Sequence, residues 1–117
     1  SSSDCAIRAI SKALCKPYNE VYIDLFNIGF EMKNLPNAQS VYEKYFKEIG
    51  YVRNKQPKKS DNTKYTVAEF ASLHNKGIYI ITIQGHMTVV IEGNIYDTWD
   101  CSNGKICLYY TPKLKEE

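Results

Sequence analysis

The sequence predicts an α+β fold in which N-terminal helices pack on a C-terminal antiparallel sheet. In the first half of the chain, apolar residues recur at helical steps of three and four. From residue 78 onward, short apolar runs alternate with turn-like pairs that contain glycine. The 117 residues suit one domain, residues 1–117, because a chain of this length leaves little room for a second hydrophobic core.

The first helix is expected over residues 4–15, where the apolar positions form one stripe at helical spacing. Ser3 or Asp4 is available as its N-cap, and Pro17 ends it. Cys5 falls in the first turn, just outside the edge of the apolar stripe. In that position a thiol can reach a cleft while its helix stays anchored in the core.

Three further helices are expected before the sheet. They cover residues 19–30, 37–49 and 67–76. Pro36 separates the first two of these, and Gly50 stops the second. Thr66 and Glu69 have the spacing of a capping box at the start of the last helix, which Gly77 closes.

The strands follow from apolar runs bounded by turn residues. Tyr51 and Val52 predict a short strand, and further strands are expected over residues 78–83, 86–91, 94–99 and, more weakly, 106–111. The pairs at 84–85 and 92–93 each end in glycine, which favours tight turns. An antiparallel meander is therefore the simplest topology.

Composition argues against several classes of function. A net charge of +2, from 15 basic and 13 acidic residues, is too balanced to indicate nucleic-acid binding. The basic stretch over residues 53–64 is interpreted as a solvated loop in preference to a binding patch.

No apolar run approaches the roughly 20 residues of a membrane span, and no signal peptide is visible. A soluble, cytoplasmic protein is expected, and its oligomeric state is left open.

No cofactor or metal is expected. The four cysteines lack the short pairs of a zinc site and are too few for a disulfide scaffold, so free thiols are expected. The two histidines are twelve residues apart, with no carboxylate at helical ligand spacing from either. No glycine-rich loop for a nucleotide is present either.

Cys5 and His86 have the chemistry of a nucleophile and its base. The thiolate is the reactive form of cysteine, and the unpaired N–H groups at a helix N-terminus favour it. His86 opens an expected strand directly after Gly85. Cys15 lies in the last turn of its helix, where the helix dipole disfavours a thiolate, so Cys5 is the preferred nucleophile.

Asp97 is the expected partner of His86. A two-residue turn at Glu92 and Gly93 would place Asp97 opposite Thr88 and one diagonal step from His86, on the same face. A bulge would reverse the faces and select Asp100 instead, and Asp97 is the favoured choice.

Two other residues near these positions have structural interpretations. Trp99 would share the face of His86 and could shield its hydrogen bond to Asp97 or fill the core, and the core role is favoured. His74, without a nearby acidic partner, is expected to be a capping or surface histidine. The order Cys5, His86, Asp97 matches a known arrangement for thiol catalysis.

These residues also resemble a known family. The segments DCAIRAI (4–10), GHMTVV (85–90) and GNIYDTWD (93–100) resemble small papain-like cysteine peptidases of phage and bacterial genomes. More distantly, they are similar to the peptidases that remove double-glycine leaders from bacteriocins. The resemblance covers nearly the whole chain, and its specific parts are the Asp-Cys and Tyr-Asp-Thr-Trp-Asp blocks.

The resemblance implies a papain-like fold with Cys5 as nucleophile, His86 as general base and Asp97 as the residue that orients His86. It implies hydrolysis of a peptide or isopeptide bond in a peptide or protein substrate, in the host cytoplasm if the chain is phage-encoded. Papain-like enzymes also use a Gln or Asn a few residues before the cysteine as an oxyanion donor. Only residues 1–4, three serines and an aspartate, precede Cys5 here. The expectation is that the amide lies outside this sequence or that a serine and the Cys5 N–H serve instead.

Two alternatives remain open from the sequence. One is another thiol acyltransferase or amidase on the same scaffold, with a peptidoglycan endopeptidase disfavoured. The other is an inert papain-like binding protein, such as a phage-encoded inhibitor of a host factor. The ten tyrosines and the basic loop would serve such an interface.

Overall fold

A computed structural model describes residues 4–113 of the chain. Its helices are α1 (Cys5–Leu14), α2 (Tyr18–Met32), α3 (Gln39–Glu48) and α4 (Val67–Leu73). Its strands are β1 (Tyr51–Asn54), β2 (Ile78–Ile83), β3 (His86–Ile91), β4 (Asn94–Tyr96) and β5 (Ile106–Pro112). The predicted α+β class, with helices first and an antiparallel sheet after them, is confirmed.

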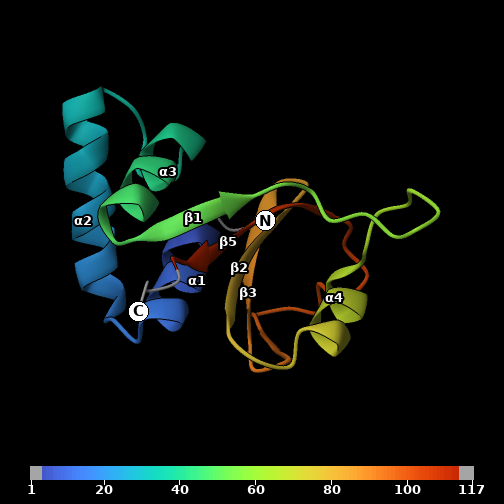
Figure 1. Cartoon of the computed structure of the whole chain (residues 1–117). Helices are drawn as coiled ribbons and strands as arrows, with labels where there is room; N and C mark the ends of the chain where they lie inside the picture. The colour runs from blue at the N-terminus through green and yellow to red at the C-terminus, as the bar shows by residue number, and fades with distance from the viewer. Residues whose placement is uncertain (1–3, 114–117) are drawn as a thin grey trace.

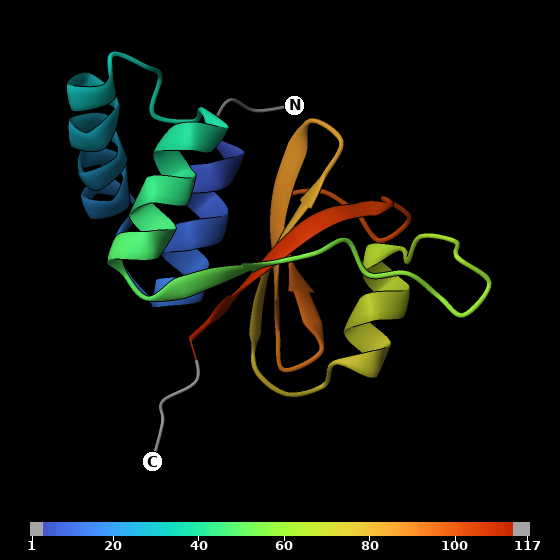
Figure 2. The same ribbon diagram turned by 45° about the horizontal axis from the view of Figure 1, so that its top comes forward.

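The helices lie on both sides of the sheet (Figures 1 and 2). α1, α2 and α3 gather on one side, and α4 lies alone on the other. Two separate hydrophobic cores result, one shared with α1–α3 and one with α4. Ile80 and Val89 belong to the first core, whereas their strand neighbours Ile81 and Val90 belong to the second. Burial on both faces explains why β2 and β3 are mostly apolar and do not alternate between apolar and polar residues.

The strand order is β1-β5-β2-β3-β4, and every neighbouring pair is antiparallel. The predicted meander holds for β2, β3 and β4 but is wrong for β5, which pairs with β2 and β1 rather than with β4. Since β5 uses both of its edges, the short β4 is left as an edge strand beside β3. This edge borders the candidate site described below.

The turn at Glu92 and Gly93 has the predicted two-residue geometry. Both residues have positive φ, 50° and 80°, as a type I′ turn requires. Ile91 therefore pairs with Asn94 and Val89 with Tyr96. The register on which the choice of Asp97 depended is confirmed.

Two predicted elements end three residues earlier in the structure. The helix expected to reach residue 76 ends at Leu73, because His74 leaves the helical conformation and its Nδ1 lies 2.9 Å from the carbonyl oxygen of Phe70. The strand expected to reach residue 99 ends at Tyr96. There the Asp97 carboxylate accepts the N–H of Thr98 at 2.7 Å, a local bond that competes with strand pairing.

Aromatic residues line the outer face of α2. They follow one another at four-residue steps: Tyr18, Tyr22, Phe26 and Phe30. Phe30 is 77% exposed.

In residues 4–113, no helix is both long enough and apolar enough to cross a membrane, and this includes α2.

The capping box of α4 yields a prediction about stability. Thr66 Oγ1 accepts the Glu69 N–H at 3.1 Å, and a Glu69 carboxylate oxygen accepts the Thr66 N–H at 2.9 Å. We expect Thr66→Ala to lower the free energy of unfolding by about 1 kcal/mol in urea denaturation, because an N-cap is lost. Thr66→Ser keeps the hydroxyl and should stay close to wild type. Equal losses in the two variants would contradict the assignment of the effect to the cap.

Candidate active site

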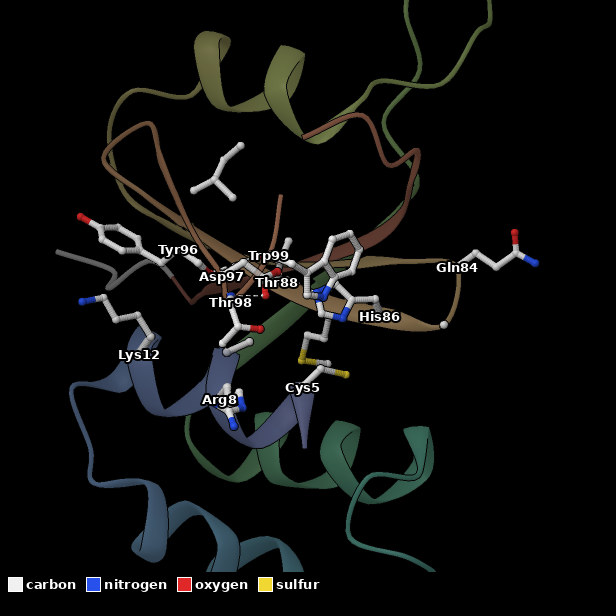
Figure 3. A pocket seen from close by; sticks show the side chains of 14 residues that line it. Cys5, Arg8, Lys12, Gln84, His86, Thr88, Tyr96, Asp97, Thr98 and Trp99 are labelled. Carbon is white, nitrogen blue, oxygen red and sulfur yellow. Dashed lines mark hydrogen bonds and ion pairs between the residues drawn. The ribbon is translucent and has the colours of Figure 1, made fainter. Parts of the chain in front are cut away.

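A cleft of about 860 Å³ lies between α1 and the β3–β4 edge of the sheet. Figure 3 shows it from close by. One wall is α1, and the other is formed by the β2–β3 turn, by β3 and β4, and by the segment that follows β4. The predicted residues Cys5, His86 and Asp97 all line this cleft. The fold thus brings together residues that are 81 and 11 positions apart in the sequence.

Cys5 is the first residue of α1, and its side chain is partly buried against the core. Figure 3 shows its sulfur on the His86 side of the helix end. Asp4 is the N-cap residue but makes no side-chain cap hydrogen bond. Its carboxylate instead accepts from Arg8 Nε at 2.9 Å and from the Tyr18 hydroxyl at 3.0 Å. The Asp4 side chain therefore does not cover the first-turn N–H groups beside the thiol.

His86 and Asp97 form a buried acid–base pair. His86 Nε2 lies 2.7 Å from Asp97 Oδ2, and the two side chains are only 5% and 9% exposed. His86 Nδ1 is also buried and has no hydrogen-bond partner within the part of the chain described. With Nε2 held by the carboxylate, Nδ1 is the unpartnered ring nitrogen, and the Cys5 thiol makes no hydrogen bond to it.

Asp97 is held ionised by several donors. Burial alone would raise its pKa, but hydrogen bonds from His86, Thr88, the Thr98 N–H and Cys101 outweigh burial and lower the pKa below its ordinary value of 3.8. The Cys101 thiol lies 3.3 Å from Asp97 Oδ2. A carboxylate that accepts so many hydrogen bonds stays charged and fixed in orientation at neutral pH.

Asp100, the alternative partner, lies elsewhere. Its carboxylate accepts the N–H of Ser102 at 3.0 Å in an exposed turn. Asp97, the favoured choice, is the one that contacts His86.

Trp99 corrects a sequence expectation. Its side chain does not fill the core, because it is 49% exposed. The indole packs against the His86 ring, with centroids 4.6 Å apart and the planes inclined by 42°. The chain leaves the β4 edge after Tyr96, and Trp99 lines the cleft beside His86 instead of following the sheet. It shields one side of the histidine from water.

His74 has the capping role expected of it, and the cysteines are free thiols, as predicted. His74 caps α4 and stacks on Phe70 with ring centroids 3.9 Å apart. Cys5, Cys15, Cys101 and Cys107 are all free thiols. Cys15 is exposed and follows the end of α1 in a left-handed conformation.

Sequence reasoning missed Cys101. Its buried thiol donates a hydrogen bond to the Asp97 carboxylate, and burial raises the pKa of the thiol so that it stays a neutral donor. The ligand atoms of His86, Asp97 and Cys101 lie within 4.8 Å of one another, close enough to share a metal ion. Direct hydrogen bonds to Asp97 Oδ2 already join all three. The spacing of four residues between Asp97 and Cys101 was the available signal.

The oxyanion donor expected before Cys5 cannot be placed, because residues 1–3 lie outside the described part of the chain. A second cavity, of about 630 Å³, adjoins Cys5 and His86. Its walls carry three side-chain amides, from Asn37, Gln39 and Gln84. Figure 3 shows the Gln84 side chain directed away from Cys5.

Comparison with known proteins gives no family for this chain. It matches no family model, and no curated protein or solved structure matches it either. The interpretation of the site therefore depends on its own geometry.

The lowered pKa of Asp97 predicts a pH-dependent contribution to stability. A carboxylate with a lowered folded pKa stabilises the fold above its ordinary value of 3.8, and this contribution is lost as the pH falls through the folded value. We expect Asp97→Asn to cost about 1–3 kcal/mol of unfolding free energy at pH 7, because a buried network is broken. The difference from wild type should shrink below pH 4.

Urea denaturation across this pH range tests the prediction, with Asp100→Asn as the matched control. Asp100 is an exposed carboxylate outside the cleft, so its loss should have a smaller effect. A difference between wild type and Asp97→Asn that does not change with pH would contradict the prediction.

Proposed function

We propose that this protein is a papain-like cysteine hydrolase that cleaves a peptide or isopeptide bond. Cys5 is the nucleophile, His86 the general base and Asp97 the residue that orients His86. The observation that carries the proposal is the buried 2.7 Å contact between His86 Nε2 and Asp97 Oδ2, in a cleft that Cys5 also lines. The partner is a peptide or protein substrate.

The first step is proton transfer from the Cys5 thiol to His86 Nδ1. Asp97 accepts a hydrogen bond from Nε2–H, which keeps the neutral ring in the tautomer with Nδ1 unprotonated. When Nδ1 takes the proton, the ring becomes cationic and the adjacent carboxylate stabilises that charge. Trp99 strengthens this interaction by keeping water from one side of the ring.

The thiolate then attacks the substrate carbonyl carbon, and the carbonyl π electrons move to its oxygen. The first-turn N–H groups of α1 stabilise this oxyanion. When the tetrahedral intermediate collapses, the C–N bond breaks and His86 returns its proton to the departing amine. A thioester to Cys5 remains. Water, deprotonated by His86, attacks the thioester and releases the acid and the free thiol.

Transfer to an amine instead of water would make the same site an acyltransferase or amidase. The lining of the cleft does not favour an amine over water as the acyl acceptor. We propose hydrolysis because water is present in any open cleft.

The free thiols support a cytoplasmic setting for the proposed activity. All four cysteines are unpaired, as is usual in a reducing compartment. If the chain is phage-encoded, that compartment is the cytoplasm of the host cell.

A second candidate function is partner binding without catalysis. The observation that favours it is the exposed aromatic face of α2, where Phe26 and Phe30 remain in contact with solvent. Cys5→Ala separates the two candidates. It would abolish the biological effect of an enzyme and leave that of a binding protein intact.

Alkylation by iodoacetamide at pH 6 tests the proposed pair, with mass spectrometry locating each modified cysteine. A thiol with an ordinary pKa of about 8.5 is roughly 0.3% thiolate at this pH. We expect Cys5 to react about 10- to 100-fold faster than this fraction allows, and His86→Ala to remove most of the acceleration.

Cys15 is the internal control, since it is an exposed free thiol of the same chain. His74→Ala is the matched control for loss of a histidine and should leave Cys5 unaffected. Slow labelling of Cys5 that is the same in wild type and in His86→Ala would refute a thiolate–imidazolium pair.

A further inference from the structure

The α1 wall of the cleft carries two cations in line with the cysteine. Cys5, Arg8 and Lys12 are separated by steps of three and four, so they lie on one face of the helix. Lys12 Nζ lies 4.4 Å from the centroid of the Tyr96 ring, which belongs to β4. Figure 3 shows Lys12 and Tyr96 near each other, at the end of the cleft away from Cys5. The ammonium is thus positioned between the two walls.

The cleft has an excess of positive charge at this end. Among residues 4–113, the one acidic residue that lines the cleft, Asp97, is engaged by His86, and Arg8 is engaged by Asp4 at 2.9 Å. Lys12 forms no ion pair with any carboxylate of residues 4–113. An ammonium at the wall of a cleft attracts an anionic group of a ligand more strongly than one on an open surface.

The helix sets the distance between this charge and the reacting sulfur. Seven residues separate Lys12 from Cys5, which corresponds to about 10 Å along α1 at 1.5 Å per residue. An extended peptide advances about 3.3 Å per residue, so the same distance spans about three substrate residues.

We propose that the cleft selects acidic peptides, with a carboxylate about three residues from the carbonyl that Cys5 attacks. Lys12 pairs with that carboxylate, and Tyr96 keeps the ammonium in place. This inference deepens the proposed function and rests on it for the identity of the reacting bond.

Two alkylating tripeptides test the selection directly. They are iodoacetyl-Gly-Gly-Glu-amide and iodoacetyl-Gly-Gly-Gln-amide, which differ in one charge at the third residue. The reaction is displacement of iodide by the Cys5 thiolate, which forms a C–S bond. We expect Cys5 to prefer the Glu reagent by about three- to tenfold, after division by the same ratio for free N-acetylcysteine in the same buffer.

Two substitutions of Lys12 test whether its charge causes the preference for the Glu reagent. Lys12→Gln should remove it and Lys12→Arg should keep most of it, because the charge is retained. Lys12 is exposed, so neither change threatens the fold. Lys47→Gln, an exposed cation on α3, is the matched control for net charge and should leave the preference unchanged.

The rates are measured at pH 8.5, where even a thiol that His86 does not activate is about half ionised. Failure of the proposed catalytic pair would appear as slow labelling at pH 6, whereas failure of the present inference would appear in the ratio at pH 8.5. Equal rates for the two reagents, or a preference that survives Lys12→Gln, would overturn the acidic selectivity.

Discussion

Packing of α1 against β3 positions the two halves of the candidate site. Ile10 of α1 is fully buried in the core that also contains Met87 and Val89 of β3. Because the apolar stripe of the helix is held there, its opposite edge faces the cleft with Cys5 at its first turn. A rotation of α1 by one residue, about 100°, would bury polar groups and remove the thiol from the cleft.

The other half of the site depends on the geometry of one hairpin. The turn at Glu92 and Gly93 sets the pairing of β3 with β4, and a slip of one residue would move the side chains of β4 and the residues after it to the opposite face. With the observed register, Asp97 contacts His86 as the chain leaves β4. Donors from the following segment, including Cys101, then hold the carboxylate ionised. The geometry of the turn at residues 92–93 thus determines that His86 and Asp97 meet as a buried acid–base pair.

The two ends of the cleft differ in charge. The acidic groups near the cysteine are each paired, Asp97 with His86 and Asp4 with Arg8. Because each of these carboxylates is paired, neither one destabilises a thiolate at Cys5 by charge repulsion. The ammonium of Lys12, held over an aromatic ring, gives the far end a positive charge. The acidic peptide proposed as substrate would place its neutral reacting carbonyl at Cys5 and its anionic part at Lys12.

The sequence by itself determined the elements whose signals are local. Thr66 and Glu69 identified the start of α4, and the turn at residues 92–93 identified both a hairpin and its register, from which the partnership of His86 and Asp97 followed. Only the tertiary structure decided that β5 pairs with β2 and that Trp99 lies over the cleft. Strands with two buried faces are apolar throughout, so their pattern does not specify a neighbour. The place of Trp99 against the His86 ring depends on a contact between segments that no local spacing encodes.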